Sequence, residues 1–145
     1  MSYTSLRYHI VFSTKDRAPM IQEAWIGNLH AFLGGCINTL GGVSLRVGGV
    51  DDHVHLFARL NPTHRVSDVL REIKSVSSQW VHREIGERRF DWQDGYSAFS
   101  VSASAAERVI AYIDGQPEHH RRRSFREELE AMLKANGIPF DPRYI

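Results

Sequence analysis

The sequence contains one cysteine, Cys36, among its 145 residues, so no disulfide can form within the chain. A lone thiol of this kind is typical of reducing compartments, where disulfides are rare. The chain also lacks any apolar run approaching the ~18 residues of a membrane span, and the N-terminal stretch "MSYTSLRYHIVFS" has no apolar signal core. These absences exclude a disulfide scaffold and favour a cytoplasmic protein.

Net charge is also small, at +1, which argues against a surface that binds nucleic acid all over. Positive charge is nevertheless concentrated locally. The segment "HHRRRSFR", residues 119–126, holds two histidines and four arginines, and "REIGERR" is another basic-leaning segment. Any binding to nucleic acid must therefore use patches, although a charged patch by itself is more typical of a solvated face.

Length and composition indicate one globular domain over residues 1–145. The chain is 42% hydrophobic and 24% charged, and it contains no repeats, low-complexity stretches or evident linkers. A domain of this size buries roughly 68–70% of the surface that its unfolded chain exposes, so it needs no structural metal to fold.

Hydrophobic periodicity predicts four strands and four helices. Alternation is clearest in "SLRYHIVFSTK", where Leu6, Tyr8, Ile10 and Phe12 share one side of a strand. The predicted strands cover residues 5–15, 43–50, 53–60 and 96–102, and the predicted helices cover residues 21–40, 61–81, 104–116 and 124–137.

This order, β-α-β-β-α-β followed by two further helices, matches the ferredoxin-like split βαβ pattern. We therefore expect an α+β fold in which an antiparallel sheet carries helices on one face, plus additional C-terminal helices. The third helix should begin at the N-cap Ser104, with Glu107 completing a capping box. The other face of the sheet should stay free for function.

Two histidines stand one residue apart in "DDHVHLFARL", residues 51–60. Successive strand residues point to opposite faces, so His53, His55, Phe57 and Arg59 share one face, and the other face is wholly apolar. The apolar face must meet the helices, which leaves the imidazoles on the free face, about 7 Å apart at their Cβ atoms. Two such imidazoles can hold one metal ion, provided that a third ligand comes from elsewhere. Chance placement of two surface histidines is the alternative.

The third predicted helix offers a ligand and a nucleophile together. Tyr112 and Gln116 are four residues apart, which places them on one face of a helix. Tyrosine can act as a covalent nucleophile, and a glutamine carbonyl oxygen suits Mg²⁺ or Mn²⁺. Without the histidines, Tyr112 would be interpreted as a packing residue. Tyr96 is the rival nucleophile, but its place on a predicted strand favours packing.

The sequence resembles the HUH-type single-tyrosine transposases, the small enzymes of insertion sequences that move DNA as a single strand. The resemblance runs through nearly the whole chain and rests on five segments in a fixed order. These are "YHIVFSTKDR", "DDHVHLF" with its His-hydrophobic-His motif, "REIKSVSSQWV", "WQDGYSAFSVS" and "YIDGQPEHH". Each segment is weak alone, whereas all five in this order are specific.

By this resemblance His53 and His55 are the paired metal ligands, Tyr112 is the nucleophile and Gln116 is the third ligand. Members of the family are dimers that recognise hairpins near the ends of the element. Each tyrosine helix docks on the histidine pair of its own subunit or of the partner subunit. The resemblance therefore implies a homodimer that binds single-stranded DNA with hairpins.

The chain departs from the family pattern next to its third ligand. Gly115 stands where a polar, helix-compatible residue is common, and Pro117 disfavours helical geometry at Gln116. Either His119 or His120 could complete the metal site in its place.

The resemblance implies a DNA transposase that cleaves and rejoins single strands at hairpin-bearing element ends. Attack by Tyr112 would give a 5′-phosphotyrosine link and a free 3′-hydroxyl, and no ATP is needed. The family favours Mg²⁺ as the divalent metal, and histidine ligands also suit Mn²⁺. The enzyme would act in the cytoplasm of a prokaryotic cell, associated with the nucleoid.

Residues that contact DNA are less clearly marked in the sequence. Basic side chains position a nucleic acid through its phosphates, and aromatic side chains stack on its bases. Trp80, Trp92 and Phe57 are candidates for stacking, although both tryptophans are more typical of a core. The candidates for phosphate contacts are Lys15, Arg17, Lys74, Arg121, Arg122 and Arg123.

Three other functions fit parts of the pattern. Relaxases and replication initiators resemble it in their paired histidines but are usually larger. A non-catalytic ferredoxin-like domain could bind RNA or DNA on its free sheet face, but Phe57 is the one clear aromatic there. A domesticated single-tyrosine nuclease could act on repeated chromosomal palindromes. The DNA flanking the gene would separate this last alternative from a mobile element.

Overall fold

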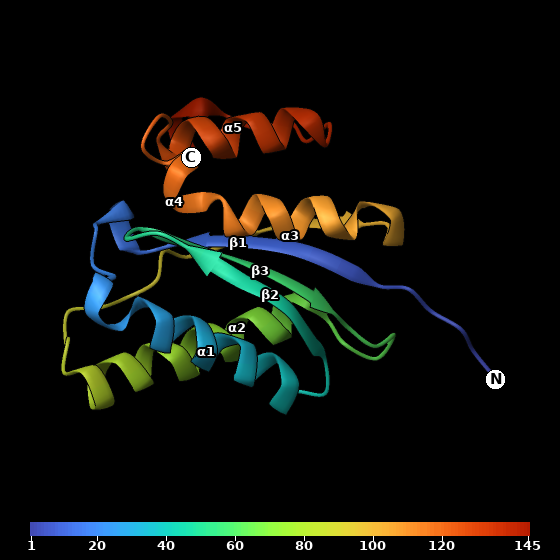
Figure 1. The fold of residues 1–145 in the computed structure, drawn as a ribbon, viewed down its shortest axis with the longest axis horizontal. Helices are drawn as coiled ribbons and strands as arrows, with labels where there is room; N and C mark the ends of the chain where they lie inside the picture. Colours follow the sequence, from blue (N-terminus) through green and yellow to red (C-terminus); the bar gives the residue numbers. More distant parts are fainter.

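Four antiparallel strands form one sheet in the computed structural model, which describes residues 1–145 (Figure 1). Their order across the sheet is β2-β3-β1-β4, so β3 and β1 are central. The register pairs Val11 with His55 and Ser13 with His53. The strands are β1 (Arg7–Ser13), β2 (Val43–Gly49), β3 (His53–Arg59) and β4 (Ser97–Val101).

Helices cover both faces of this sheet (Figure 1). The chain order begins β1-α1-β2-β3-α2-β4, which confirms the predicted split βαβ pattern and the α+β class. On one face lie α1 (Glu23–Thr39) and α2 (Val66–Trp80), and on the other lie α3 (Ala106–Asp114), α4 (Gln116–His119) and α5 (Phe125–Ala135). None of these helices is both long enough and apolar enough to cross a membrane.

The main core lies between the sheet and the α1–α2 layer. Val54, Leu56 and Ala58 of β3 point into it and are fully buried, as their alternation with polar residues predicts. From α1, Leu29 and Leu33 meet them, also with no exposed surface. Full burial of a leucine contributes roughly 1.5–3 kcal/mol, so this layer of 17 buried residues dominates the stability of the fold.

The prediction of a free second face is wrong. Phe57 has 0% exposed surface, because the C-terminal helices cover the face from which it projects, while Arg59 at the end of the strand is exposed. A second, smaller apolar cluster fixes α5 to this face. It consists of Val11, Phe99, Phe125 and Leu133. Phe57 is therefore unavailable for base stacking.

Two local predictions also differ from the structure. A 3-10 turn precedes α3, so the residue at its N-cap is Ala105, and Ser104 makes no capping hydrogen bond. A complete capping box occurs instead at the start of α5, between Ser124 and Glu127. Tyr96 precedes β4 and is 41% exposed, so it does not pack as the strand prediction required.

Candidate functional site

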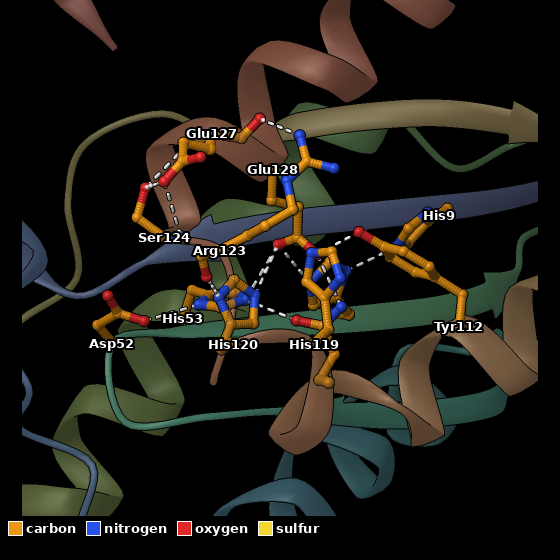
Figure 2. Close-up of polar contacts among 12 residues, drawn as sticks. His9, Asp52, His53, Tyr112, His119, His120, Arg123, Ser124, Glu127 and Glu128 are labelled. Carbon is orange, nitrogen blue, oxygen red and sulfur yellow. Dashed lines mark hydrogen bonds and ion pairs between the residues drawn. The ribbon is translucent and has the colours of Figure 1, made fainter.

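His53 and His55 lie side by side on the β3 face that α3 to α5 cover, and both side chains are fully buried. Their rings are 5.0 Å apart between centroids. The Nε2 atom of each ring lies 3.2 Å from the same oxygen, Oε1 of Glu128 on α5. The two imidazoles therefore converge on one point from the middle of the sheet. Figure 2 shows His53 and Glu128 at this point.

Gln116 and Tyr112 reach the same point from the other layer. Gln116 is the first residue of α4, after the end of α3 at Asp114, and Pro117 sits in the first turn, where a missing N–H is tolerated. The Gln116 Oε1 atom is 2.9 Å from His53 Nε2. The Tyr112 hydroxyl donates a hydrogen bond to Glu128. Both residues meet the histidine pair of their own chain.

Glu128 is the residue of this site that the sequence prediction missed. Its side chain is 1% exposed and accepts a hydrogen bond of 2.7 Å from Gln116 Nε2. One signal for it does exist in the sequence. Phe125, Leu129 and Met132 form the apolar stripe of α5, and position 128 lies within that stripe, where an acid is out of place.

A second layer of groups orients the two imidazoles. Asp52 Oδ1 is 2.7 Å from His53 Nδ1, and His9 Nε2 is 2.7 Å from His55 Nδ1. His9 stands on β1, beside β3, and stacks on the His55 ring at 5.0 Å between centroids. Such outer contacts are usual around metal-binding histidines, because they fix the ring and leave the other nitrogen free.

His119 and His120, the alternative third ligands, also approach the site. His120 Nε2 is 3.2 Å from Glu128 Oε1, and its ring lies 4.5 Å from the His53 ring between centroids. The ligand atoms of His53, His120 and Glu128 lie within 4.8 Å of one another, a grouping that could hold a metal ion. His119 Nε2 is 3.4 Å from Glu128 Oε2.

Burial and the shared carboxylate shift the pKa values of His53, Glu128 and Tyr112. Burial alone would lower the pKa of His53, but its hydrogen bonds to Asp52 and Glu128 outweigh this and raise it to about 9. Burial alone would raise the pKa of Glu128, but hydrogen bonds from His120, His53 and His55 hold it far below its usual range. For Tyr112, burial and then Glu128 raise the pKa well above its ordinary value, so the side chain is a neutral phenol at neutral pH.

The neighbouring His55 behaves differently from His53. Burial lowers the pKa of His55 below its ordinary value, against the attraction of Glu128. Burial and the nearby His55 also lower the pKa of His9, to about 3. Both rings are therefore neutral near pH 7, the form in which an imidazole binds a metal.

A glycine on β2 sets how closely α3 approaches the sheet. A Cβ atom on Gly48 would lie 2.6 Å from Ile113 Cγ2 and 3.0 Å from its backbone oxygen. Ile113 is 1% exposed and follows Tyr112 directly, so this contact fixes the height of the Tyr112 ring above the histidines.

We expect Gly48→Ala to destabilise the protein by about 1–3 kcal/mol, because the added methyl group overpacks this contact. Activity should fall as well, since α3 must move away from the sheet. Thermal unfolding measures the first effect. Gly35→Ala is the matched control, because nothing lies within 4 Å of a Cβ at this exposed position on α1. This control substitution should stabilise the helix slightly. Equal destabilisation by both changes would contradict the packing argument.

The predicted DNA-binding residues are not gathered in one place. Lys74 already donates to the backbone oxygens of Gln93 and Gly95, at 2.5 and 2.8 Å, which reduces its availability for phosphate. Arg17 lies over the Phe125 ring, 5.6 Å from its centroid, and Lys15 is exposed. Arg121, Arg122 and Arg123 are exposed immediately after α4, next to the buried site.

Comparisons with known proteins agree with this arrangement. A family model described as "Transposase IS200 like" matches residues 2–116. A search of curated proteins finds no match. Among solved structures, a candidate transposase from Deinococcus radiodurans R1 is similar with a TM-score of 0.66 and 21% identity, over 79% of this chain and 93% of that chain. The REP-associated tyrosine transposase bound to a REP hairpin is similar with a TM-score of 0.61 and 16% identity, over 83% of this chain and 72% of that chain.

Proposed function

Because the chain belongs to the IS200-like transposase family, we propose that it cleaves and rejoins single-stranded DNA at hairpin-bearing element ends through a 5′-phosphotyrosine intermediate. One observation carries the proposal. The Tyr112 hydroxyl and the Nε2 atoms of His53 and His55 all contact one buried carboxylate, so the nucleophile and the paired imidazoles share a single point. A tyrosine that only packs in a core does not need a buried carboxylate and two imidazoles beside its hydroxyl.

The donor atoms at this point suit a divalent metal ion. His53 and His55 present Nε2, and Gln116 presents Oε1, which together make a mixed nitrogen and oxygen set. Such a set suits Mg²⁺ or Mn²⁺, with Mg²⁺ favoured by the family resemblance. When bound, the ion would polarise the scissile phosphate and offset the charge that develops on its oxygens.

Tyr112 supplies the nucleophile in this proposal. Its oxygen forms a bond to phosphorus while the bond from phosphorus to the 3′ oxygen of the preceding nucleotide breaks. The phenol proton leaves toward an acceptor, and the departing 3′ oxygen gains a proton. The covalent link preserves the phosphodiester energy, so a 3′-hydroxyl can later reverse the step and join strands without ATP.

Hairpin DNA and a homodimer belong to the same proposal. A protein of similar fold was solved bound to a REP hairpin, which supports a DNA hairpin as the class of ligand. Dimerisation is implied by the resemblance alone. Both β2 and β4 are edge strands of the sheet, so an edge is present on each side for contact with another chain.

Covalent trapping tests the proposal. The protein is incubated with Mg²⁺ and labelled single-stranded DNA taken from the flanks of its gene, and the products are separated in denaturing gel. We expect a labelled protein band, and mass spectrometry should place the nucleotide on the peptide containing Tyr112. Cleavage that leaves every labelled 5′ end free of protein would contradict the proposal.

Exposed arginines beside the site are expected to strengthen binding to the phosphate backbone. Replacement of Arg121, Arg122 and Arg123 together by alanine should weaken DNA binding and flatten its dependence on salt, because fewer counterions are released. Titration of fluorescent DNA at several salt concentrations measures the slope. Replacement of Arg83, Arg88 and Arg89, which follow α2, serves as the matched control for lost charge. An unchanged slope in the first variant would exclude the patch.

A further inference from the structure

The Glu128 carboxylate lies at the centre of the site although it belongs to a different part of the chain. The family model ends at residue 116, whereas Glu128 is on α5. Figure 2 shows it pointing from α5 toward the histidines, where its Oε1 atom is 3.2 Å from Nε2 of both His53 and His55. Its Oε2 atom accepts hydrogen bonds from Tyr112 and Gln116.

The distances around this carboxylate match those between neighbouring ligands of one ion. In an octahedral site with bonds of about 2.1 Å, adjacent donor atoms are roughly 3 Å apart. Here His53 Nε2 is 2.9 Å from Gln116 Oε1, and Glu128 Oε1 is 3.2 Å from the Nε2 atoms of His53 and His55. A divalent ion between these atoms fits these distances.

We propose that Glu128 is a fourth protein ligand of the metal and that the metal thereby fastens α5 over the active site. The inference rests on the proposed function, because it takes His53, His55 and Gln116 as the other ligands. With α5 in place, the ligand side chains have no exposed surface, so a DNA phosphate reaches them only after Glu128 leaves.

The rest of the structure allows α5 to leave without unfolding the domain. Apolar contacts hold α5 through a small cluster with four buried residues, whereas the main core has 17 on the opposite side of the sheet. Phe125 and Leu133 are the two members of the small cluster that α5 contributes. Elements with few buried contacts open at low free energy, so a single ligand bond can decide whether α5 is closed.

Binding of Mn²⁺ to the whole chain, measured by calorimetry without DNA, tests the assignment. We expect Glu128→Gln to weaken Mn²⁺ affinity by roughly 10–100-fold, since it removes a charged ligand and keeps the shape of the side chain. Glu130→Gln is the matched control. It removes an acid from the same helix, where Glu130 pairs with Arg126 at 3.3 Å, and it should leave the affinity unchanged. Far-UV circular dichroism checks that both variants fold.

The possible failures are distinguishable. If His55→Ala abolishes Mn²⁺ binding while Glu128→Gln binds as tightly as the parent, Glu128 is not a ligand and the proposed function stands. If the parent protein binds no Mn²⁺, both the fourth ligand and the metal of the proposed function are wrong. Equal weakening by the Glu128 and Glu130 variants would also overturn the assignment, because it would reflect charge and not coordination.

Hydrogen exchange provides a readout of α5 itself. Addition of Mn²⁺ should slow amide exchange over residues 125–135 in the parent protein and leave it unchanged in Glu128→Gln. Exchange in α1, on the other side of the sheet, serves as the internal reference. Equal slowing of α5 in both proteins would show that the metal does not act through Glu128.

Discussion

Replacement of Tyr112 by phenylalanine is expected to abolish the covalent protein–DNA adduct completely. Phenylalanine keeps the ring and removes the only atom that can attack phosphorus in the proposed step. DNA binding should survive, because the ring is partly buried among His9 and His55 and its packing is retained. The measurement is the labelled protein band in a denaturing gel, compared with DNA binding measured under the same conditions.

The control for this variant is Tyr96→Phe. Tyr96 is 41% exposed, and Tyr112 is the tyrosine whose ring packs against His9 and His55, so loss of the Tyr96 hydroxyl should leave the adduct intact. An adduct formed by Tyr112→Phe at the parent level would disprove the assigned nucleophile. If only Tyr96→Phe lost the adduct, the nucleophile would be Tyr96.

A large loss of strand cleavage is also expected when His55 is replaced by alanine. The change removes a proposed metal ligand and leaves His9 without its partner in a buried place. Strand cleavage should fall by roughly 100-fold or more, because changes outside the ligand sphere alone usually cost roughly 10–100-fold. Metal titration should show a parallel loss of Mn²⁺ affinity.

The matched control removes a histidine from the opposite face of the sheet. His30 is on α1, and its Nε2 atom has no hydrogen-bond partner, so His30→Gln should cleave DNA at the parent rate. Unfolding temperatures of both variants separate loss of function from loss of structure. If His55→Ala were folded and still cleaved DNA at the parent rate, the proposed metal site would be excluded.

Much of this site follows from periodicity in the sequence. Alternation along β3 places Val54 and Leu56 in the main core, and the same rule places His53 and His55 together on the other face. Spacing of four residues brings Tyr112 and Gln116 to one side of α3 even though the helix ends between them. The structure brings these side chains together because strand alternation and the four-residue helical spacing set the direction of each one.

The contribution of α5 could not be predicted in the same way. Periodicity identifies the helix, but it does not say which face of the sheet a C-terminal helix covers. The free-face prediction therefore failed at Phe57, and Glu128 passed unnoticed among the neighbouring acids Glu127 and Glu130. Only the tertiary packing of Phe125 against the sheet brings residue 128 to the histidines.

The covered sheet also bears on the alternative functions. A non-catalytic domain that binds RNA or DNA on an open sheet needs exposed aromatics there, and Phe57 is fully buried. A domesticated nuclease and a mobile transposase share the same site chemistry. The DNA around the gene distinguishes them, since terminal hairpins indicate a mobile element and dispersed palindromes indicate domestication.

The short contact between His9 and His55 couples the proton positions of these two rings. If His55 offers the lone pair of Nε2 to a metal, its own proton must sit on Nδ1 and be donated to His9 Nε2. His9 then accepts that hydrogen bond at Nε2 and carries its own proton on Nδ1. Asp52 imposes the same Nδ1–H form on His53. Metal binding would therefore place the remaining proton of both ligand rings on Nδ1, and a substitution at position 9 would alter the chemistry of a ring that it does not replace.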